Sequence, residues 1–289
     1  MYQDNPSILK PNDENVMIWR YLSFGKFHHL IKSGALHFSR SDILRNFDKF
    51  EGRVTKKTYD TMKQLLVKSN SDQKWPPEEP EEYEKLIKEI RTVFGKIPLV
   101  TAVNCWHVNE YDSDAMWKRY VNMSEGLAVV SSFKRLKSCF DDCKEDVYIG
   151  VVEYDYDSSS FLDLSSCKND PENKGRIKSN FNAYSALFHK KEQYKHEREL
   201  RAVVSRLRTV GESIMVLLKG NKLEERLLEQ NDKIFSNKGI DVPVNIKSLI
   251  GKIVVAPNAE DWFIELVRSE TIKYGLNIEI VRSTLADDV

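Results

Sequence analysis

Residues 194–204 constrain the fold of this chain more than any other segment, because their side chains alternate in character. Successive side chains of an extended strand point to opposite faces of a sheet. One face would carry the apolar side chains Leu200, Ala202 and Val204. The other face would carry the charged side chains Glu197, Glu199 and Arg201. We therefore expect a core strand with a polar face, and charges beside a core need partners.

The composition is that of an ordinary soluble globular protein, with 41% hydrophobic and 30% charged residues in a chain of 289. Lys plus Arg and Asp plus Glu both number 44, so no overall field directs the protein toward nucleic acid or an anionic membrane. Residues 174–208 are locally basic, and they include the alternating segment. An anionic ligand there is one interpretation, and a solvated basic face is the simpler one.

The sequence lacks the motifs of several common binding and catalytic sites, and it also lacks the segments that direct a protein to a membrane or to secretion. The four cysteines lack the paired spacing of a zinc site, which favours structural thiols in a reducing compartment. Residues 1–13 lack an apolar signal segment, and no stretch approaches a membrane span in length. The chain also has no Gly-rich dinucleotide fingerprint, P-loop or serine-hydrolase motif. We therefore expect a cytoplasmic protein with no membrane partner.

Apolar periodicity predicts single strands between helices at irregular spacing, which is typical of one α+β domain over residues 1–289. The expected sheet is mixed or antiparallel, with helical insertions, of which the main one covers about residues 53–95. Expected strands cover residues 17–22, 35–39, 98–106, 126–132, 147–154, 251–256 and 277–281. Expected helices cover residues 24–32, 81–94, 114–121, 180–189 and 261–274, and a proline-containing loop covers residues 69–80.

The two glutamates of the alternating segment suggest acid–base chemistry. Residues two apart on a strand lie about 7 Å from each other on one face, so Glu197 and Glu199 would be neighbours. Repulsion between them would raise one pKa, while Arg201 would lower both. One carboxylate could then stabilise a developing cation while the other accepts a proton. An exposed sheet face, with Glu and Arg paired across strands, is the simpler structural alternative.

Two further segments carry candidate ligand-binding residues. Arg20 lies beside aromatic residues on the first long expected strand, where a guanidinium can pair with phosphate and stack on a ring. A surface arginine at a sheet edge is the alternative. Trp117 and Tyr120 are three residues apart on one helical face and could form the wall of a ligand cleft. A core-facing aromatic stripe is the more common arrangement.

The acidic segment at residues 46–52 offers a different kind of site. Asp48 and Glu51, together with Glu197 and Glu199, could provide the oxygen ligands of a Mg²⁺ or Mn²⁺ ion. A turn stabilised by its own Asn and Asp side chains explains the same segment more simply. We therefore expect no resident metal.

Short motifs follow one another in a set order along the chain, and they resemble those of a widespread bacterial family. The motifs are Trp19-Arg20-Tyr21, Leu36-His37-Phe38-Ser39, Asn46 to Gly52, Met116-Trp117 to Tyr120, Glu125-Gly126, Glu197-x-Glu199-x-Arg201 and Ile253-Val254-Val255-Ala256-Pro257. The family carries a domain-of-unknown-function label and occurs in bacteria and phage-related loci. The resemblance covers about residues 16–284. This chain departs from it at residues 46–51, where the family usually has Asn-Asp-Pro-Phe-Glu with different spacing.

The order of three elements is similar to that of ADP-ribosyltransferase-like domains: a strand with Arg20, a helix ending at Gly34, and a later strand with two glutamates. This resemblance implies a split sheet and NAD as substrate. Arg20 would hold NAD, and Glu199 would stabilise the oxocarbenium-like transition state as nicotinamide leaves. Glu197 would orient or deprotonate the acceptor. The other residues that we expect to bind the cofactor are Tyr21, Ser39, Trp117, Tyr120 and Arg201.

The sequence leaves three functions open. The favoured hypothesis is an NAD-consuming ADP-ribosyltransferase or glycohydrolase that serves as a toxin or anti-phage effector, with an unidentified acceptor. The second is a module that binds a nucleotide or another anion without turnover. The third is a metal-dependent nuclease. The strand near Asn277 could also pair with a second copy of the chain to form a homodimer.

Overall fold

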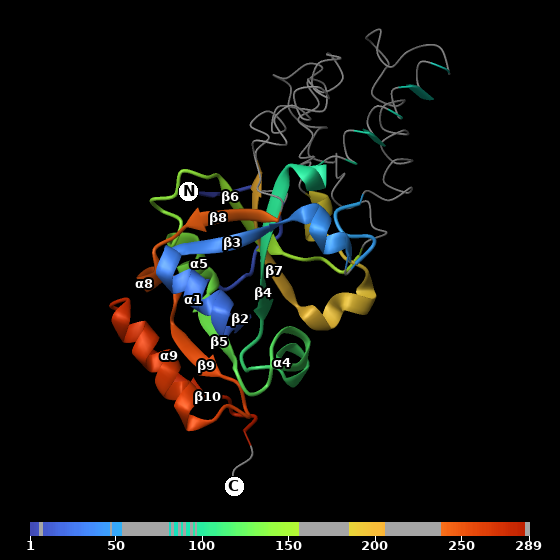
Figure 1. The fold of residues 1–289 in the computed structure, drawn as a ribbon. Helices are drawn as coiled ribbons and strands as arrows, with labels where there is room; N and C mark the ends of the chain where they lie inside the picture. The colour runs from blue at the N-terminus through green and yellow to red at the C-terminus, as the bar shows by residue number, and fades with distance from the viewer. Residues whose placement is uncertain are drawn as a thin grey trace.

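One large mixed β-sheet organises the computed structural model, which describes residues 1–5, 8–46, 48–53, 97–155, 185–205 and 238–286 and a few positions between 81 and 95 (Figure 1). The sheet follows the order β1-β6-β7-β4-β2-β5-β9-β10, with β3 and β8 on a side branch. Only the β1–β6 and β9–β10 pairs among the described strands are parallel. The strands are β1 Tyr2–Gln3, β2 Met17–Ser23, β3 Ala35–Arg40, β4 Thr101–Val108, β5 Gly126–Ser132, β6 Val147–Val151, β7 Glu199–Ser205, β8 Gly239–Pro243, β9 Lys252–Val255 and β10 Glu279–Arg282.

Short helices connect and cover these strands. The α-helices are α1 Phe24–Ser33, α4 Asp114–Tyr120, α5 Phe133–Ser138, α8 Ile246–Leu249 and α9 Asp261–Lys273. The 3₁₀-helices are η1 Ser41–Asn46, η2 Ile97–Leu99, η5 Ser185–Phe188 and η6 Glu192–Glu197. Helix α1 ends where Gly34 adopts a left-handed conformation, with φ of 64°, which glycine tolerates because it has no Cβ.

The sheet forks at β4. One edge of β4 pairs with β7 along its length, from Thr101 opposite Ser205 to His107 opposite Glu199. The other edge pairs with β3 near its start and with β2 near its end. Residues 104–106 lie between these two stretches and have no strand partner on that edge within the described part of the chain. Side chains fill the fork instead: Arg20 Nη1 donates to the Cys105 carbonyl at 2.7 Å, and Asn104 Nδ2 donates to the His37 carbonyl at 2.8 Å.

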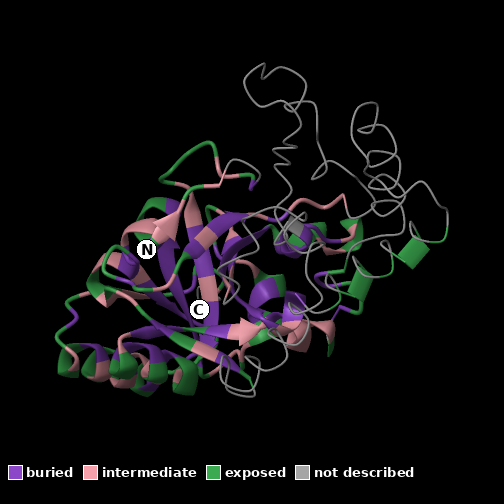
Figure 2. Cartoon of the chain, turned by 90° about the horizontal axis from the view of Figure 1, so that it is seen from above, coloured by how far each residue is buried: buried purple, intermediate pink, exposed green. Residues whose placement is uncertain are grey.

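The two faces of the sheet are buried differently. The larger apolar core covers the face that carries Trp106 and Leu200, and it includes residues of α1, α5 and α9. The opposite face carries two smaller apolar clusters, one centred on Trp117 of α4 and one that includes Leu187 and Phe188. Glu199 and Arg201 lie on this second face, which we call the polar face. Figure 2 shows that most of the strand residues are buried.

The expected mixed sheet with several helices is confirmed, and most expected strands and helices are present within a few residues of the predicted bounds. The prediction for residues 194–198 is wrong. Residues 192–197 form a 3₁₀-helix, so Glu197 precedes β7 and does not lie on it. The expected strand at 147–154 ends at Val151, and β1 and β8 were not predicted.

Several predictions fall on the parts of the chain that the structure does not describe. The insertion at residues 53–95, with its loop and its helix, lies almost entirely there, and so do residues 180–184 of the expected helix at 180–189. In the described part, no helix has both the length and the apolar character needed to cross a membrane. The strand β10 ends the sheet, and its pairing with a second copy stays a prediction.

Candidate functional site

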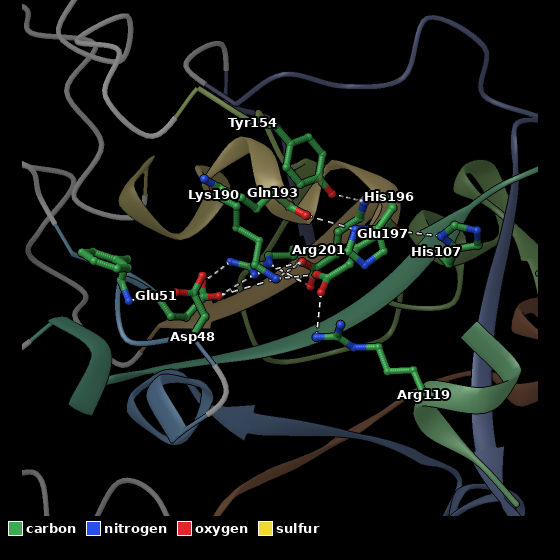
Figure 3. A network of polar contacts seen from close by, with 12 residues as sticks. Asp48, Glu51, His107, Arg119, Tyr154, Lys190, Gln193, His196, Glu197 and Arg201 are labelled. Atoms are coloured by element: carbon green, nitrogen blue, oxygen red, sulfur yellow. Dashed lines mark hydrogen bonds and ion pairs between the residues drawn. The ribbon is translucent and has the colours of Figure 1, made fainter. Parts of the chain in front are cut away.

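Five charged side chains meet on the polar face of the sheet, and we call them the ion cluster (Figure 3). All five are buried, and the Arg201 side chain is 0% exposed. They come from the turn after η1, from the segment between η5 and η6, from the end of η6 and from β7. The members are Glu51, Lys190, Glu197, Glu199 and Arg201.

A single left-handed residue separates the two glutamates of the cluster. Arg198 has φ of 40°, an unfavourable conformation for a residue with a Cβ, and it is held by contacts on both sides. Its carbonyl accepts a hydrogen bond from the Val108 amide at 2.8 Å, and its Nη1 donates to Asn109 at 2.8 Å. The chain changes from 3₁₀-helix to strand at this residue. Glu197 and Glu199 nevertheless reach the same ammonium group, although Glu197 does not lie on the strand.

Arg201 uses all of its hydrogen-bond donors inside the cluster. A guanidinium has five N–H groups. Two form a bidentate pair with Glu199, with both donor–acceptor distances 3.0 Å, and two contact the Glu51 carboxylate at 2.5 and 3.0 Å. The fifth donates to the Leu187 carbonyl. Arg201 therefore has no donor left for a ligand, and it acts by holding Glu51 and Glu199 in place.

The ammonium of Lys190 lies among three carboxylates. Its Nζ donates to Glu197 at 2.5 Å and to Glu199 at 3.1 Å, and it lies 3.8 Å from a Glu51 oxygen. A divalent cation would take this central position in a three-carboxylate metal site. No group of three or more metal-ligating side chains in the described residues is arranged to hold a metal ion. The hypothesis of a metal-dependent nuclease therefore requires a metal ion at a position that the ammonium group of Lys190 occupies.

Asp48 stabilises its own turn, as the turn interpretation of residues 46–52 predicts. Its Oδ1 accepts a hydrogen bond from the Phe50 amide at 2.9 Å, and its carbonyl accepts one from the Glu51 amide at 3.0 Å. Gly52 closes this turn with φ of 60°. Glu51 then points toward Arg201, so the altered spacing of this acidic segment still delivers one carboxylate to the cluster.

The charges of the cluster fix one another's protonation states. Burial alone would raise the pKa of Glu199, but the positive charges of Arg201 and Lys190 outweigh burial and hold the pKa at about 2. Burial alone would lower the pKa of Lys190, but the surrounding glutamates raise it well above its usual value. Glu199 is therefore ionised and Lys190 protonated near neutral pH.

Arg119 and Tyr120 of α4 border the cluster on its more exposed side (Figure 3 shows Arg119). Arg119 Nη2 lies 2.8 Å from Glu197 Oε1, although without the alignment of a hydrogen bond, and its side chain is 39% exposed. The guanidinium lies 5.7 Å from the centre of the Tyr120 ring, and Tyr120 is 51% exposed. Burial of the phenol oxygen, together with Glu197 and Glu199, raises the pKa of Tyr120 to about 12. Tyr120 therefore lies within electrostatic range of the two carboxylates, while about half of its surface meets solvent.

Neighbouring groups support the two catalytic candidates. His107 Nδ1 lies 2.6 Å from the Glu197 carbonyl, and burial lowers the pKa of this imidazole. The neutral ring therefore donates from Nδ1, which fixes the backbone of Glu197. The Tyr154 hydroxyl accepts a hydrogen bond from the Glu199 amide at 2.8 Å. Gly150 pairs with Arg201 across β6 and β7, and a Cβ there would lie 2.1 Å from Ile8, so glycine allows the chain to close over the cluster.

The structure brings together only some of the predicted site residues. Glu197, Glu199 and Arg201 share the cluster, and Tyr120 borders it. Arg20 projects from the opposite face, since it pairs with Val129 of the larger core and stacks 5.9 Å from the Trp106 ring, and its guanidinium comes within electrostatic range of Tyr120. Its guanidinium lies in the fork of the sheet.

The remaining predicted binding residues make contacts within the protein that support its fold. Trp117 is fully buried, its Nε1 donates to Asp112 at 3.0 Å, and its ring packs edge-on against Tyr21. The Tyr21 hydroxyl accepts from the Ser113 amide. Ser39 is half-buried in β3, opposite Val103 and Gly239. Trp117 therefore matches the alternative interpretation, a core-facing aromatic.

Sequence reasoning missed Lys190, Arg119 and Gly150. Lys190 lies in the basic run of residues 174–208, so the excess of positive charge there was the available signal. Its partners are three carboxylates separated by up to about 150 residues from one another, and no local pattern links them. Arg119 stands between the two aromatic residues of α4 that were noted, and only the fold places it against Glu197.

Residues 116–202 match the model of a family described as a protein of unknown function, DUF2971. The resemblance to a domain-of-unknown-function family is therefore confirmed over that segment. The matched segment begins within α4, contains β5, β6 and most of the ion cluster, and ends within β7. A comparison with curated proteins found no match.

Proposed function

We propose that this protein consumes NAD as an ADP-ribosyltransferase-like enzyme, with Glu199 as the catalytic carboxylate. The observation that carries the proposal is the fixed, ionised state of Glu199 beside a second carboxylate, Glu197, with one ammonium bridging them. A buried negative charge held in place before reaction can stabilise positive charge that develops on a ribose as nicotinamide leaves.

Glu197 is suited to the acceptor side of such a reaction. Its Oε2 is held by Lys190, while its Oε1 meets the half-exposed Arg119. The backbone of Glu197 is fixed by His107, so the carboxylate has a defined position. A group that approaches past Arg119 would therefore meet Glu197 first, and Glu197 would orient it or accept its proton.

The forked sheet also supports the proposal. A split sheet is what the resemblance to ADP-ribosyltransferase-like domains implies, and β4 divides its second edge between β3 and β2. Arg20 lies in this fork and bonds two carbonyl oxygens, Cys105 and His37. These contacts favour a structural role for Arg20, which holds the fork together, over direct contact with NAD.

The primary experiment measures nicotinamide release from NAD by the purified protein. We expect release by the unchanged protein and a loss of at least about 100-fold in Glu199→Gln, since the developing charge loses its partner. Glu265→Gln, an exposed glutamate of α9, is the matched control and should release nicotinamide normally. No release by a folded, unchanged protein, or equal release by Glu199→Gln, would exclude the enzyme.

A second variant separates catalysis from folding, because Glu199→Gln leaves Arg201 with less negative charge. Tyr120→Phe removes only a hydroxyl that lies within electrostatic range of the two carboxylates, at a half-exposed position. We expect this variant to unfold at the same temperature as the unchanged protein and to release nicotinamide more slowly. An unchanged rate with Tyr120→Phe would place the reacting atoms away from Glu197 and Glu199.

A role as a toxin or defence effector would follow from loss of cellular NAD. Expression of the unchanged protein in bacteria should lower NAD and arrest growth, whereas Glu199→Gln at the same protein level should not. Growth arrest by both proteins would show that any toxicity has another cause.

One observation favours a second function, a module that binds an anion without turnover. Both oxygens of Glu199 already accept hydrogen bonds from Arg201 and Lys190, so little capacity remains for a ribose hydroxyl. In this case NAD or ADP-ribose would bind and be recovered chemically unchanged after hours. Calorimetry combined with chromatography of the recovered nucleotide distinguishes the two functions.

A further inference from the structure

The ion cluster reaches charge balance only with a residue at its edge. Its members contribute three negative charges, from Glu51, Glu197 and Glu199, and two positive charges, from Lys190 and Arg201. Arg119 supplies a third positive charge through its contact with Glu197 Oε1. Without Arg119 in this position, the cluster would carry one net negative charge.

Among the described cations that contact these glutamates, Arg119 is also the most loosely held. Arg201 has no exposure and all five donors engaged, and Lys190 is 8% exposed, whereas Arg119 is 39% exposed. Its contact with Glu197 is close, at 2.8 Å, but lacks hydrogen-bond alignment. A long side chain with this exposure can turn toward solvent at small cost.

The surroundings of Arg119 suit a nucleotide. A guanidinium pairs with phosphate oxygens through two parallel hydrogen bonds. The half-exposed ring of Tyr120 lies beside it and offers a flat surface on which a base can stack. Lys118, the preceding residue, is 66% exposed and pairs instead with Asp114. Lys118 and Arg119 are therefore adjacent on α4 but have different partners, and Arg119 is the one that contacts the ion cluster.

We propose that Arg119 is an anion-operated gate: a phosphate group of a nucleoside diphosphate ligand pairs with Arg119, draws it from Glu197, and exposes Glu197 Oε1 to the ligand. The gate deepens the proposed function, because it concerns the same site. It makes Glu197 available only when a phosphate-bearing ligand is present.

The test measures binding of ADP, which carries the diphosphate but no nicotinamide. Calorimetry should show tighter binding of ADP than of adenosine, and Arg119→Ala should weaken ADP binding by about 10-fold or more. Lys118→Ala is the matched control on the same helix and should bind ADP normally. Equal ADP affinity in Arg119→Ala and the unchanged protein would overturn the gate.

A second variant distinguishes a gate from a plain phosphate contact. Glu197→Gln removes the charge that holds Arg119 in the closed position, so it should strengthen ADP binding several-fold. The double variant Glu197→Gln with Arg119→Ala should bind ADP as weakly as Arg119→Ala alone. Unchanged or weaker ADP binding by Glu197→Gln would show that Glu197 does not restrain Arg119, and the gate would be rejected.

These measurements remain informative if NAD is not consumed. ADP binding that follows the expected pattern, with no nicotinamide release, would reject the enzyme and retain the gate in a binding module. Nicotinamide release that Glu199→Gln abolishes, with ADP affinity insensitive to Arg119, would retain the enzyme and reject the gate.

Discussion

The two faces of β7 are equally buried but are held by different forces. Leu200 on one face and Arg201 on the other both have 0% exposure. Leu200 packs into the large apolar core, where contacts are non-directional. Arg201 has five directed hydrogen bonds and two carboxylate partners. The apolar face tolerates small shifts, whereas the polar face is satisfied only when every partner is in place.

A buried ion network is an expensive way to fill a protein interior. Desolvation of the charges offsets much of their attraction, and well-packed apolar residues of similar volume are often as stable or more so. Stability alone therefore does not account for the ion cluster. The difference between the faces teaches that Leu200 serves the fold, whereas Arg201 and its partners are the part of the sheet on which the proposed function rests.

Replacement of one partner in the polar face should have the largest effect. Arg201→Met leaves Glu51 and Glu199 buried together, and we expect a loss of about 3–5 kcal/mol in the free energy of unfolding. Urea denaturation measures this value. A loss below about 1 kcal/mol would mean that the two carboxylates find other partners.

Replacement of Arg201 together with its two carboxylate partners sharpens the same comparison. A triple variant, Arg201→Met with Glu51→Leu and Glu199→Leu, removes charges of both signs. We expect it to recover most of the stability lost by Arg201→Met alone, since the two carboxylates that Arg201→Met leaves without their guanidinium are also removed, and Lys190 still pairs with Glu197. It should lack the activities proposed for the site. A triple variant as unstable as the single one would show that the cluster is needed for folding.

The apolar face should respond by cavity formation. Leu200→Ala should cost about 3 kcal/mol in urea denaturation, close to the usual range for a buried leucine. This loss should be the same at pH 4 and pH 7, because no titrating group is removed. A loss that changes with pH would indicate that the two faces are coupled through β7.

The polar face should depend on pH in acid. The pKa of Glu199 is about 2 in the folded protein, below its ordinary value of 4.5. Its ionisation therefore stabilises the fold fully above pH 4.5, and this contribution is lost as the pH falls from 4.5 toward 2. We expect the stability of the unchanged protein to fall more steeply in this range than that of Glu199→Gln. Urea denaturation at several pH values measures this difference. If both proteins lost stability equally between pH 4.5 and pH 2, the pKa assigned to Glu199 would be wrong.

The edge of the cluster should contribute least to stability. Arg119→Ala removes a half-exposed cation, and we expect a loss of about 1 kcal/mol or less. Lys118→Ala, which removes an exposed pair on the same helix, should cost about 0.5 kcal/mol or less. Thermal unfolding of both variants measures the difference. A loss above about 3 kcal/mol for Arg119→Ala would make it a structural member of the cluster.

The elements that sequence predicted correctly are those with a strong local period. Residues 126–132 form β5 with the predicted bounds, and residues 24–33 form a helix that ends before Gly34. Residues 194–198 failed for a physical reason. Alternation suggested an extended chain, but the left-handed Arg198 is stabilised by Val108 and Asn109, which are distant in sequence.

The sequence by itself determined that Leu200, Ala202 and Val204 share a buried face and that Glu199 and Arg201 share the other, because strand periodicity is a local property. It also marked Glu197 as a candidate, although by a wrong local structure. Only the tertiary structure decided that Glu51 and Lys190 complete the cluster, that Arg119 closes it and that Arg20 lies on the opposite face. Those outcomes depend on strand order and register, since charges brought together from distant segments leave no pattern in the sequence between them.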